Sequence, residues 1–248
     1  MLPEVVTDFL ILFQMMCVVV VFAYLVTRTR FYPEVLEGGF SWKNQAILIL
    51  IFGVLSIYGS ESGIDILGAP LNIRDLGPMV AGFVGGPVAG IGAGLIGAGY
   101  RMTMGGFTAV SCSLATVLAG LLAGMINLAN RRRFPGLLLA VSGAVLIEGM
   151  HMGLVLLLSR PLPDAVELVS DAAFPMIAAN AAGMFIFALI TLNFENERRT
   201  CRERDRYQAE LQRKNAELQI AREIQESFLP PSLPTLPGYA LAAESRPA

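Results

Sequence analysis

The feature that most constrains this chain is an apolar, glycine-rich stretch from Asn72 to Gly106. It holds 11 of the chain's 25 glycines and two prolines, and an arginine stands near each end, Arg74 and Arg101. Inside a membrane, backbone interrupted in this way survives only where protein packs around it or where it lines a polar cavity. The stretch is therefore either a glycine-rich packing helix or a broken helix pair that builds a small-molecule site, as interrupted segments do in transporters.

Composition places the whole chain in the same setting. Of its 248 residues, 54% are hydrophobic and 15% are charged, with a mean hydropathy of +0.61. A soluble domain carries about 25% charged residues, and the charges here are dense only after residue 195. We predict an integral membrane protein with a hydrophilic C-terminal extension and with no nucleic-acid partner. The three cysteines show neither metal-ligand nor disulfide spacing.

Six runs have the length and apolarity of helices, and about 20 apolar residues span a bilayer core. The first is too long for a signal peptide and is expected to stay as a transmembrane helix. The predicted fold class is an all-α integral membrane helical bundle: an extra N-terminal span, a core with a broken Gly/Pro-rich hairpin, and a long cytoplasmic coiled-coil helix. The runs are Val5–Thr27, Asn44–Tyr58, Gly77–Tyr100, Thr108–Leu128, Gly136–Ser159 and Ala173–Phe194.

The basic residues predict how the chain crosses the membrane. Cytoplasmic loops are rich in Lys and Arg, but six simple spans cannot place all the basic clusters on the cytoplasmic side. The conflict disappears if residues 73–84 and 88–100 form two short antiparallel helices that break at Gly85-Gly86-Pro87. The N-terminus is then extracytoplasmic and the C-terminus cytoplasmic, in a bacterial inner (plasma) membrane.

Folding this hairpin brings Arg74 and Arg101 to one extracytoplasmic mouth, where two guanidiniums can hold a carboxylate. The alternative is that both arginines reach toward lipid headgroups. Cys112 and Ser113 follow on the next helix and are candidates to bind a ligand oxygen, although a buried cysteine is often only a packing residue. Asn72 is a candidate to cap the first half-helix or to touch the ligand.

Two ionisable residues, Glu148 and His151, lie one turn apart within an apolar run. Such residues are rare in spans and usually face the bundle interior. They are expected to contact the ligand, to act as a proton-sensitive switch, or to form a structural pair. His151 is the only histidine, which argues against a zinc site and against a Ser-His-Asp triad, so no metal is expected.

The segment after residue 194 is rich in helix formers and lacks proline and glycine until Pro230. A heptad pattern predicts a coiled coil of two copies, with a single solvated helix as the alternative because few heptads are present. The predicted domains are 1–43, an N-terminal helix and loop; 44–194, the ligand-sensing region; 195–229, a signalling helix; and 230–248, the start of a truncated domain. The heptad positions are Tyr207, Leu211, Lys214, Leu218, Ala221, Gln225 and Phe228.

The run from Asn72 to Gly124, with Glu148, Met152, Arg160-Pro161, Pro175-Met176, Asn180 and Gly183 downstream, resembles the LytS-YhcK-type five-transmembrane receptor domain over residues 44–194. The resemblance implies a bacterial sensor fused to a cytoplasmic output domain. Members with a known ligand bind pyruvate through two arginines, a cysteine and a serine, and Arg74, Arg101 and Cys112 match those positions. The serine position is Ala115 here, with Ser111, Ser113 and Thr116 as substitutes.

The motif AREIQESFLPPSLPTLPGYALAAESRPA resembles the linker and first strand of SpoIIE/RsbU-type protein serine/threonine phosphatases. This resemblance implies a metal-dependent phosphatase in the parent protein, with Mg²⁺ or Mn²⁺ as cofactor and a phosphoprotein as substrate. The motif ends before any metal-binding aspartate, so this fragment itself is expected to be neither an enzyme nor a cofactor protein.

We expect a membrane receptor that senses a small carboxylate and signals as a homodimer. A second hypothesis is a solute-binding transport component, because the hairpin also resembles the substrate-binding subunits of vitamin transporters. A third is that the spans serve only as a membrane anchor or dimeriser.

Overall fold

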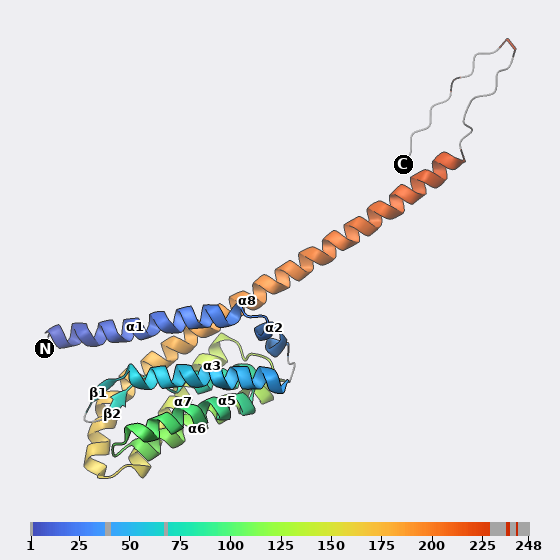
Figure 1. The fold of residues 1–248 in the computed structure, drawn as a ribbon. Helices are drawn as coiled ribbons and strands as arrows, with labels where there is room; N and C mark the ends of the chain where they lie inside the picture. Colours follow the sequence, from blue (N-terminus) through green and yellow to red (C-terminus); the bar gives the residue numbers. More distant parts are fainter. Residues whose placement is uncertain (1, 38–40, 67–68, 229–236, 239–241, 243–248) are drawn as a thin grey trace. The chain divides into compact units, whose positions relative to one another are not determined.

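The structure is a computed structural model that describes residues 2–37, 41–66, 69–228, 237–238 and 242. The chain divides into two compact units, Met1–Phe194 and Glu195–Ala248. Of the predicted truncated domain start at 230–248, only residues 237–238 and 242 are among the described residues. The elements in chain order (Figure 1) are α1 (Leu2–Thr27), α2 (Phe31–Leu36), α3 (Trp42–Glu61), β1 (Ile64–Ile66), β2 (Ala69–Leu71), α4 (Leu76–Gly85), α5 (Pro87–Met104), α6 (Ala109–Ala129), α7 (Leu137–Leu158) and α8 (Leu162–Ser227).

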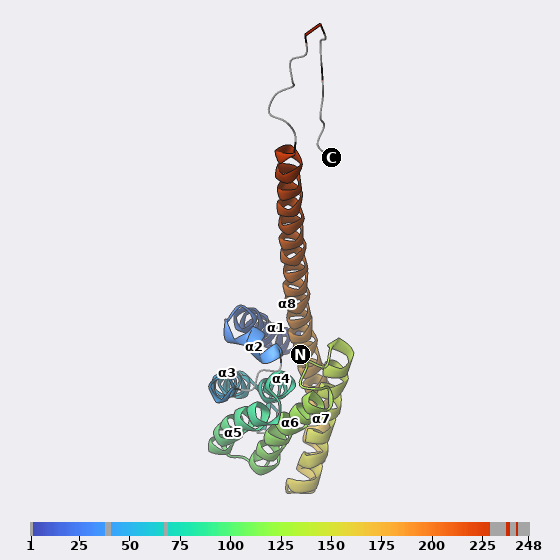
Figure 2. The ribbon, with the colours of Figure 1, turned by 90° about the vertical axis from the view of Figure 1, so that its right-hand side faces the viewer.

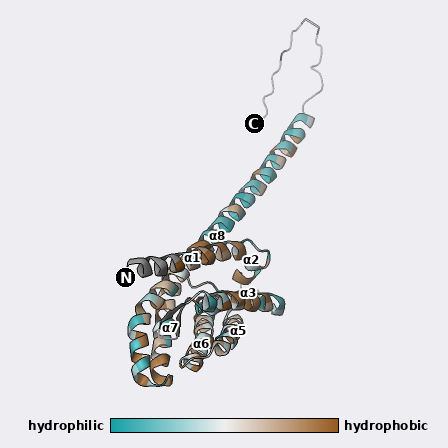
Figure 3. Cartoon of the chain, turned by 60° about the vertical axis from the view of Figure 1, so that its left-hand side comes forward, coloured by the Kyte–Doolittle hydropathy of each residue, from teal (hydrophilic) through white to brown (hydrophobic). Residues whose placement is uncertain are grey.

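The nearly all-helical architecture confirms the predicted fold class of an all-α membrane bundle. Four helices in the described chain, α3, α6, α7 and α8, are long and apolar enough to cross a membrane, and Cys17–Thr27 and Leu76–Gly85 are shorter apolar segments. Hydrophobic residues dominate α3 and the nearby helices, whereas α8 becomes hydrophilic toward its C-terminal part (Figure 3). The antiparallel pair β1–β2 was not predicted; Ile64 lies opposite Leu71 between α3 and α4.

The glycine-rich stretch forms two helices that break at Gly86, as the basic residues predicted. Gly86 has φ +83° and ψ −171°, a conformation that disfavours residues with a Cβ. Pro87 follows as the first residue of α5, where a missing N–H is tolerated. The stretch also packs closely: a Cβ on Gly90 would meet the carbonyl of Gly120 on α6, and the reverse also holds. The stretch therefore both packs closely and breaks into a helix pair, while the small-molecule site stays a prediction.

The core of the first unit is built around α6 and α3. Helix α6 contacts α4, α5 and α7, and α3 contacts α4 and α5, an arrangement visible end-on in Figure 2. Phe52 of α3 makes edge-on ring contacts with Phe22 of α1 and Phe187 of α8, at centroid distances of 5.7 and 6.0 Å. Tyr32 of α2 bonds Thr191 of α8 at 2.8 Å. These contacts join α1, α2 and α3 to the membrane part of α8.

The last helix differs most from its prediction. The last span was expected at 173–194, but α8 already begins at Leu162 and continues through Pro175. Proline is tolerated in spans when neighbouring groups take over its lost contacts. Asn180 donates to the carbonyls of Met176 and Asn72. In the second unit, residues 201–228 are exposed in this single chain, and the coiled coil stays a prediction.

Candidate functional site

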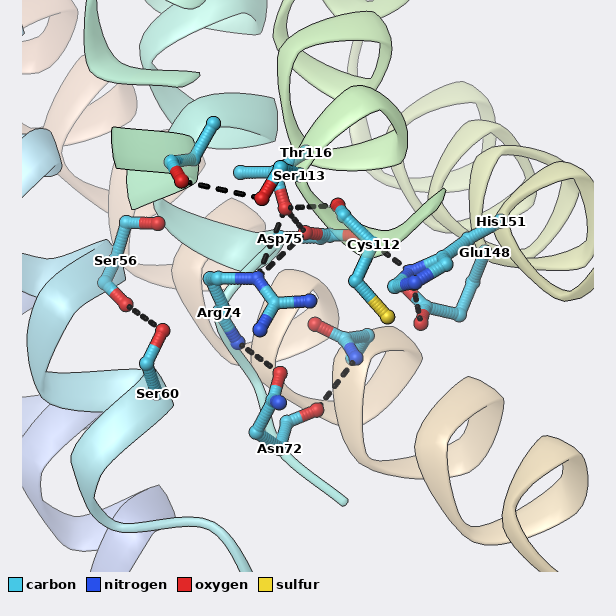
Figure 4. Close-up of polar contacts among 12 residues, drawn as sticks. Ser56, Ser60, Asn72, Arg74, Asp75, Cys112, Ser113, Thr116, Glu148 and His151 are labelled. Carbon is cyan, nitrogen blue, oxygen red and sulfur yellow. Dashed lines mark hydrogen bonds and ion pairs between the residues drawn. The ribbon is translucent and has the colours of Figure 1, made fainter. Parts of the chain in front are cut away.

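A buried group of polar side chains lies where five parts of the bundle meet, and we call it the central polar cluster. All of its members are at most 9% exposed. The β2–α4 connection, α5, α6, α7 and α8 each contribute (Figure 4). Its members are Asn72, Arg74, Asp75, Arg101, Cys112, Thr116, Glu148, His151 and Asn180.

Asp75 is the hub of this cluster. Its Oδ1 accepts a hydrogen bond from Thr116 at 2.6 Å, and its Oδ2 lies 2.7 Å from Nδ1 of His151. The Arg74 Nε lies 3.7 Å from Oδ1 and donates to the Thr116 hydroxyl at 2.9 Å. An aspartate directly before a helix usually caps it, but Asp75 makes no cap bond to α4. Its carboxylate instead links three elements of the bundle.

Glu148 and His151 face the same hub from α7. Nδ1 of His151 lies 3.4 Å from Oε1 of Glu148 as well as 2.7 Å from Asp75. The predicted pair therefore exists, and the imidazole stands between two carboxylates. Arg74 balances part of this negative charge, which matters because buried ions are stable only when paired and hydrogen-bonded.

Arg101 and Cys112 complete the cluster on the side of α5 and α6. Two nitrogens of Arg101 donate to the Gly105 carbonyl at 2.6 Å and to the Thr108 hydroxyl at 2.9 Å. The Cys112 side chain, 9% exposed, belongs to the same cluster. In Figure 4 its sulfur lies between the Arg74 guanidinium and the Glu148–His151 pair. The hairpin thus brings both predicted arginines to one thiol.

Several polar atoms of the cluster have no hydrogen-bond partner among the described residues. An unsatisfied buried polar group costs about 1–3 kcal/mol, so these atoms are donors and acceptors that water, an ion or a ligand can satisfy. The side chains concerned are 0–1% exposed. The atoms are Nη1 of Arg74, Nε of Arg101, both carboxylate oxygens of Glu148, Nε2 of His151 and Oδ1 of Asn180.

The structure brings most of the predicted site residues together, with one set apart. Ser113 donates its hydroxyl hydrogen to the Ala98 carbonyl at 3.1 Å, so it ties α6 to α5. Thr116, one turn after Cys112, supplies the hydroxyl that makes hydrogen bonds within the cluster. Asn72 supports Arg74, whose backbone N–H donates to the Asn72 Oδ1 at 3.1 Å.

Asp75 is the member that sequence reasoning missed. It stands directly after Arg74 in a segment with no other acid between Asp65 and Glu148. A lone carboxylate beside a buried arginine was the available signal, because each ion needs a partner inside a membrane protein.

The cluster also has the composition of a metal site. Ligand atoms of Asp75, Glu148 and His151 lie within 4.8 Å of one another. However, the fixed positive charge of Arg74 lies 3.7 Å from Asp75, and a second guanidinium lies beside Cys112. Two arginines oppose a second cation there by like-charge repulsion, so we assign these groups to an ion-pair network.

Access to the cluster requires the helices to move. The two arginines, Glu148 and His151 are at most 1% exposed. A separate cavity lies at the α4–α5 turn, lined by Gly85, Gly86 and Pro87 with Gln45 and Asn127. It stands at the far end of α4 from Arg74. A ligand could therefore reach these side chains only after the surrounding helices had separated.

Comparison with known proteins places this arrangement in a family. Residues 29–193 match the family described as 5TMR of 5TMR-LYT. The chain belongs to this family. The 5TMR region contains the hairpin, the central polar cluster and the part of α8 that crosses the membrane. No solved structure matches the chain.

Curated relatives share the 5TMR region. The chain is 34% identical over 189 residues to the sensor histidine kinase BtsS of Escherichia coli K12, a match that covers 74% of this chain and 34% of the relative. It is 33% identical over 191 residues to the sensor protein LytS of Bacillus subtilis 168, covering 70% of this chain and 32% of that relative. The chain thus spans about a third of the length of these relatives. They support a multi-pass membrane sensor, and they do not support the predicted phosphatase part.

Proposed function

We propose that the 5TMR region of this chain is a receptor for a small carboxylate, a 2-oxo acid such as pyruvate, which enters from the extracytoplasmic side. Arg74 and Arg101 hold the carboxylate, and polar groups around Cys112 orient the rest of the ligand. The members of this family that are named above are sensors, which supports sensing over transport or simple anchoring.

One observation carries the proposal. Two arginines are 1% exposed, converge on one thiol, and each keeps a guanidinium nitrogen without a partner among the described residues. A guanidinium presents several donors in a fixed fork that matches a carboxylate. Arginines that only reached toward headgroups would be exposed at the bundle surface, as Arg160 is.

The bound state must differ from the free state for the receptor to signal. We propose that the ligand pulls the β2–α4 connection and α8 together, because Asn180 of α8 bonds Asn72 directly. Helix α8 continues without interruption to Ser227. Pairing of its C-terminal part with a second copy would cover Leu211 and Leu218, which are 59% and 65% exposed here, and would carry the change as a homodimer.

Our proposal for the output reaction is based on the C-terminal motif alone. That motif favours a serine/threonine phosphatase that needs Mg²⁺ or Mn²⁺ and acts on a phosphoprotein, whereas the relative BtsS is named a sensor histidine kinase and favours a kinase. Purified full-length protein separates the two. Autophosphorylation from ATP would establish the kinase, and Mn²⁺-dependent loss of phosphate from phosphoserine proteins would establish the phosphatase.

The receptor itself is tested by the thermal stability of the purified chain in detergent with a panel of small carboxylates, pyruvate included. A ligand that binds only the folded state raises stability by about 2.7 kcal/mol at 100 times its Kd. We expect a rise for one acid that is lost in Arg74→Ala and Arg101→Ala and kept in Arg160→Ala, an exposed arginine as matched control. Movement of the acid across proteoliposomes by the chain alone would favour the transport hypothesis instead.

A further inference from the structure

The central polar cluster contains an arrangement that binding of a carboxylate does not require. Asp75, His151 and Cys112 stand in series on the β2–α4 connection, α7 and α6. Asp75 holds the imidazole through Nδ1 at 2.7 Å. Nε2, on the other side of the ring, is buried and has no partner among the described residues. In Figure 4 the Cys112 sulfur lies beside the Glu148–His151 pair.

This order of groups is that of an activated nucleophile. A carboxylate on Nδ1 fixes the tautomer that leaves the lone pair on Nε2, and that lone pair accepts the proton of a neighbouring thiol or hydroxyl. Arginines beside a cysteine favour its thiolate, which is the reactive form. In Figure 4 the Cys112 sulfur lies beside the Arg74 guanidinium. Of the three cysteines, it is the buried one, while Cys17 and Cys201 are exposed.

A nucleophile in a receptor needs an electrophile in its ligand. The ligand proposed above carries a carbonyl carbon directly bonded to the carboxylate that the arginines hold. We propose that Cys112 forms a reversible thiohemiketal with the carbonyl carbon of a bound 2-oxo acid, with His151, oriented by Asp75, carrying the proton. The inference rests on the proposed function and adds to it a covalent step that only an acid with a 2-oxo group can make.

The step balances without any further reactant. The thiol proton moves to Nε2 of His151, and the sulfur electron pair forms a C–S bond to the carbonyl carbon. The π bond of the carbonyl breaks, and its electron pair stays on the oxygen. That oxygen then takes the proton back from Nε2 and becomes a hydroxyl. No atom is oxidised or reduced, and the reverse sequence releases the ligand unchanged.

The adduct also gives the cluster a means to distinguish ligands. Lactate has the same carboxylate and nearly the same size as pyruvate, but it has no carbonyl carbon to accept the sulfur. Simple ion pairing with Arg74 and Arg101 would bind the two acids similarly. A covalent step that only pyruvate can make raises its affinity alone.

The test uses chain 1–248 in nanodiscs, with Cys17→Ser and Cys201→Ser so that Cys112 is the single thiol. Pyruvate labelled with ¹³C at the carbonyl carbon is added, and its spectrum is compared with that of pyruvate and its hydrate without protein. We expect a bound signal in the region of tetrahedral carbon bonded to oxygen and sulfur. The signal should disappear in Cys112→Ser and weaken strongly in His151→Gln.

Affinity provides a second readout that does not depend on the spectrum. We expect pyruvate to bind at least about tenfold more tightly than lactate, which corresponds to 1.4 kcal/mol. Cys112→Ser should remove this preference while still binding both acids through the arginines. If Cys112→Ser does not fold, the spectrum and the preference of the single-thiol protein decide the matter.

The two proposals fail in different ways. If pyruvate stabilises the protein, Arg74→Ala abolishes that effect, and the carbonyl carbon stays a ketone, the adduct is wrong and the receptor stands. If pyruvate neither stabilises the protein nor changes its signal, both are wrong. Loss of binding after treatment with a chelator would overturn the adduct in favour of a metal held by Asp75, Glu148 and His151.

Discussion

Replacing Asp75 by asparagine tests the hub of the central polar cluster. The change keeps the size of the side chain and removes its charge. Arg74 would lose its nearest carboxylate, at 3.7 Å, and His151 its partner at 2.7 Å. Breaking a buried ion pair by removing one partner costs about 3–5 kcal/mol. One kcal/mol shifts the melting temperature of a 150–250-residue domain by about 2–4 °C, so we expect Asp75→Asn to melt roughly 6–20 °C lower.

The assay is thermal unfolding of the purified protein in one detergent at one concentration, with Asp171→Asn as matched control. Asp171 is an exposed aspartate of α8, and a surface substitution usually changes stability by less than about 0.5 kcal/mol. The double variant Asp75→Asn with Arg74→Gln should be less unstable than the sum of the two single changes, because both members of the pair are gone. Equal melting temperatures of Asp75→Asn and Asp171→Asn would refute the role of Asp75 as the hub of the cluster.

Three further predictions concern the frame around the cluster. Gly90→Ala should destabilise the bundle, because the added Cβ would meet the Gly120 carbonyl. Gly99→Ala, whose Cβ would have nothing within 4 Å, should stabilise it by up to about 1 kcal/mol. The melting temperatures of the two variants test both expectations. Tyr32→Phe loses its 2.8 Å bond to α8 and should cost about 1–3 kcal/mol in a denaturant titration. Leu218→Asn should shift the protein from dimer to monomer by light scattering, and an unchanged mass would contradict pairing through α8.

Much of the frame could be predicted from the sequence, because apolar length and glycine placement act locally. The break at Gly86 followed from charge sorting and from a Gly-Gly-Pro run, and the structure has it. The helix runs were found for the same reason. The early start of α8 at Leu162 was missed, because Pro175 suggests a boundary when only the chain is read, although the bundle accommodates it.

Most charged residues of the candidate site were predicted from the sequence. Asp75 and the hydrogen bonds that connect the residues were not. Arg74, Arg101, Glu148 and His151 stand out because ionisable groups are costly inside a membrane. Asp75 was hidden by its ordinary position before a helix, where a cap is expected. Whether Ser113 or Thr116 bonds the cluster depends on the rotation of α6 against α4 and α7. That rotation is fixed by tertiary packing, which spacing along one helix does not show.

The central claim is that Arg74 and Arg101 bind a small carboxylate inside the 5TMR region. Equilibrium binding of labelled pyruvate to the purified chain tests this claim most directly, with wild type, Arg74→Ala, Arg101→Ala and the control Arg160→Ala measured side by side. We expect saturable binding to the wild type and to Arg160→Ala, and none to Arg74→Ala or Arg101→Ala. Wild-type affinity in Arg74→Ala, or no saturable binding of any carboxylate to the wild type, would contradict it.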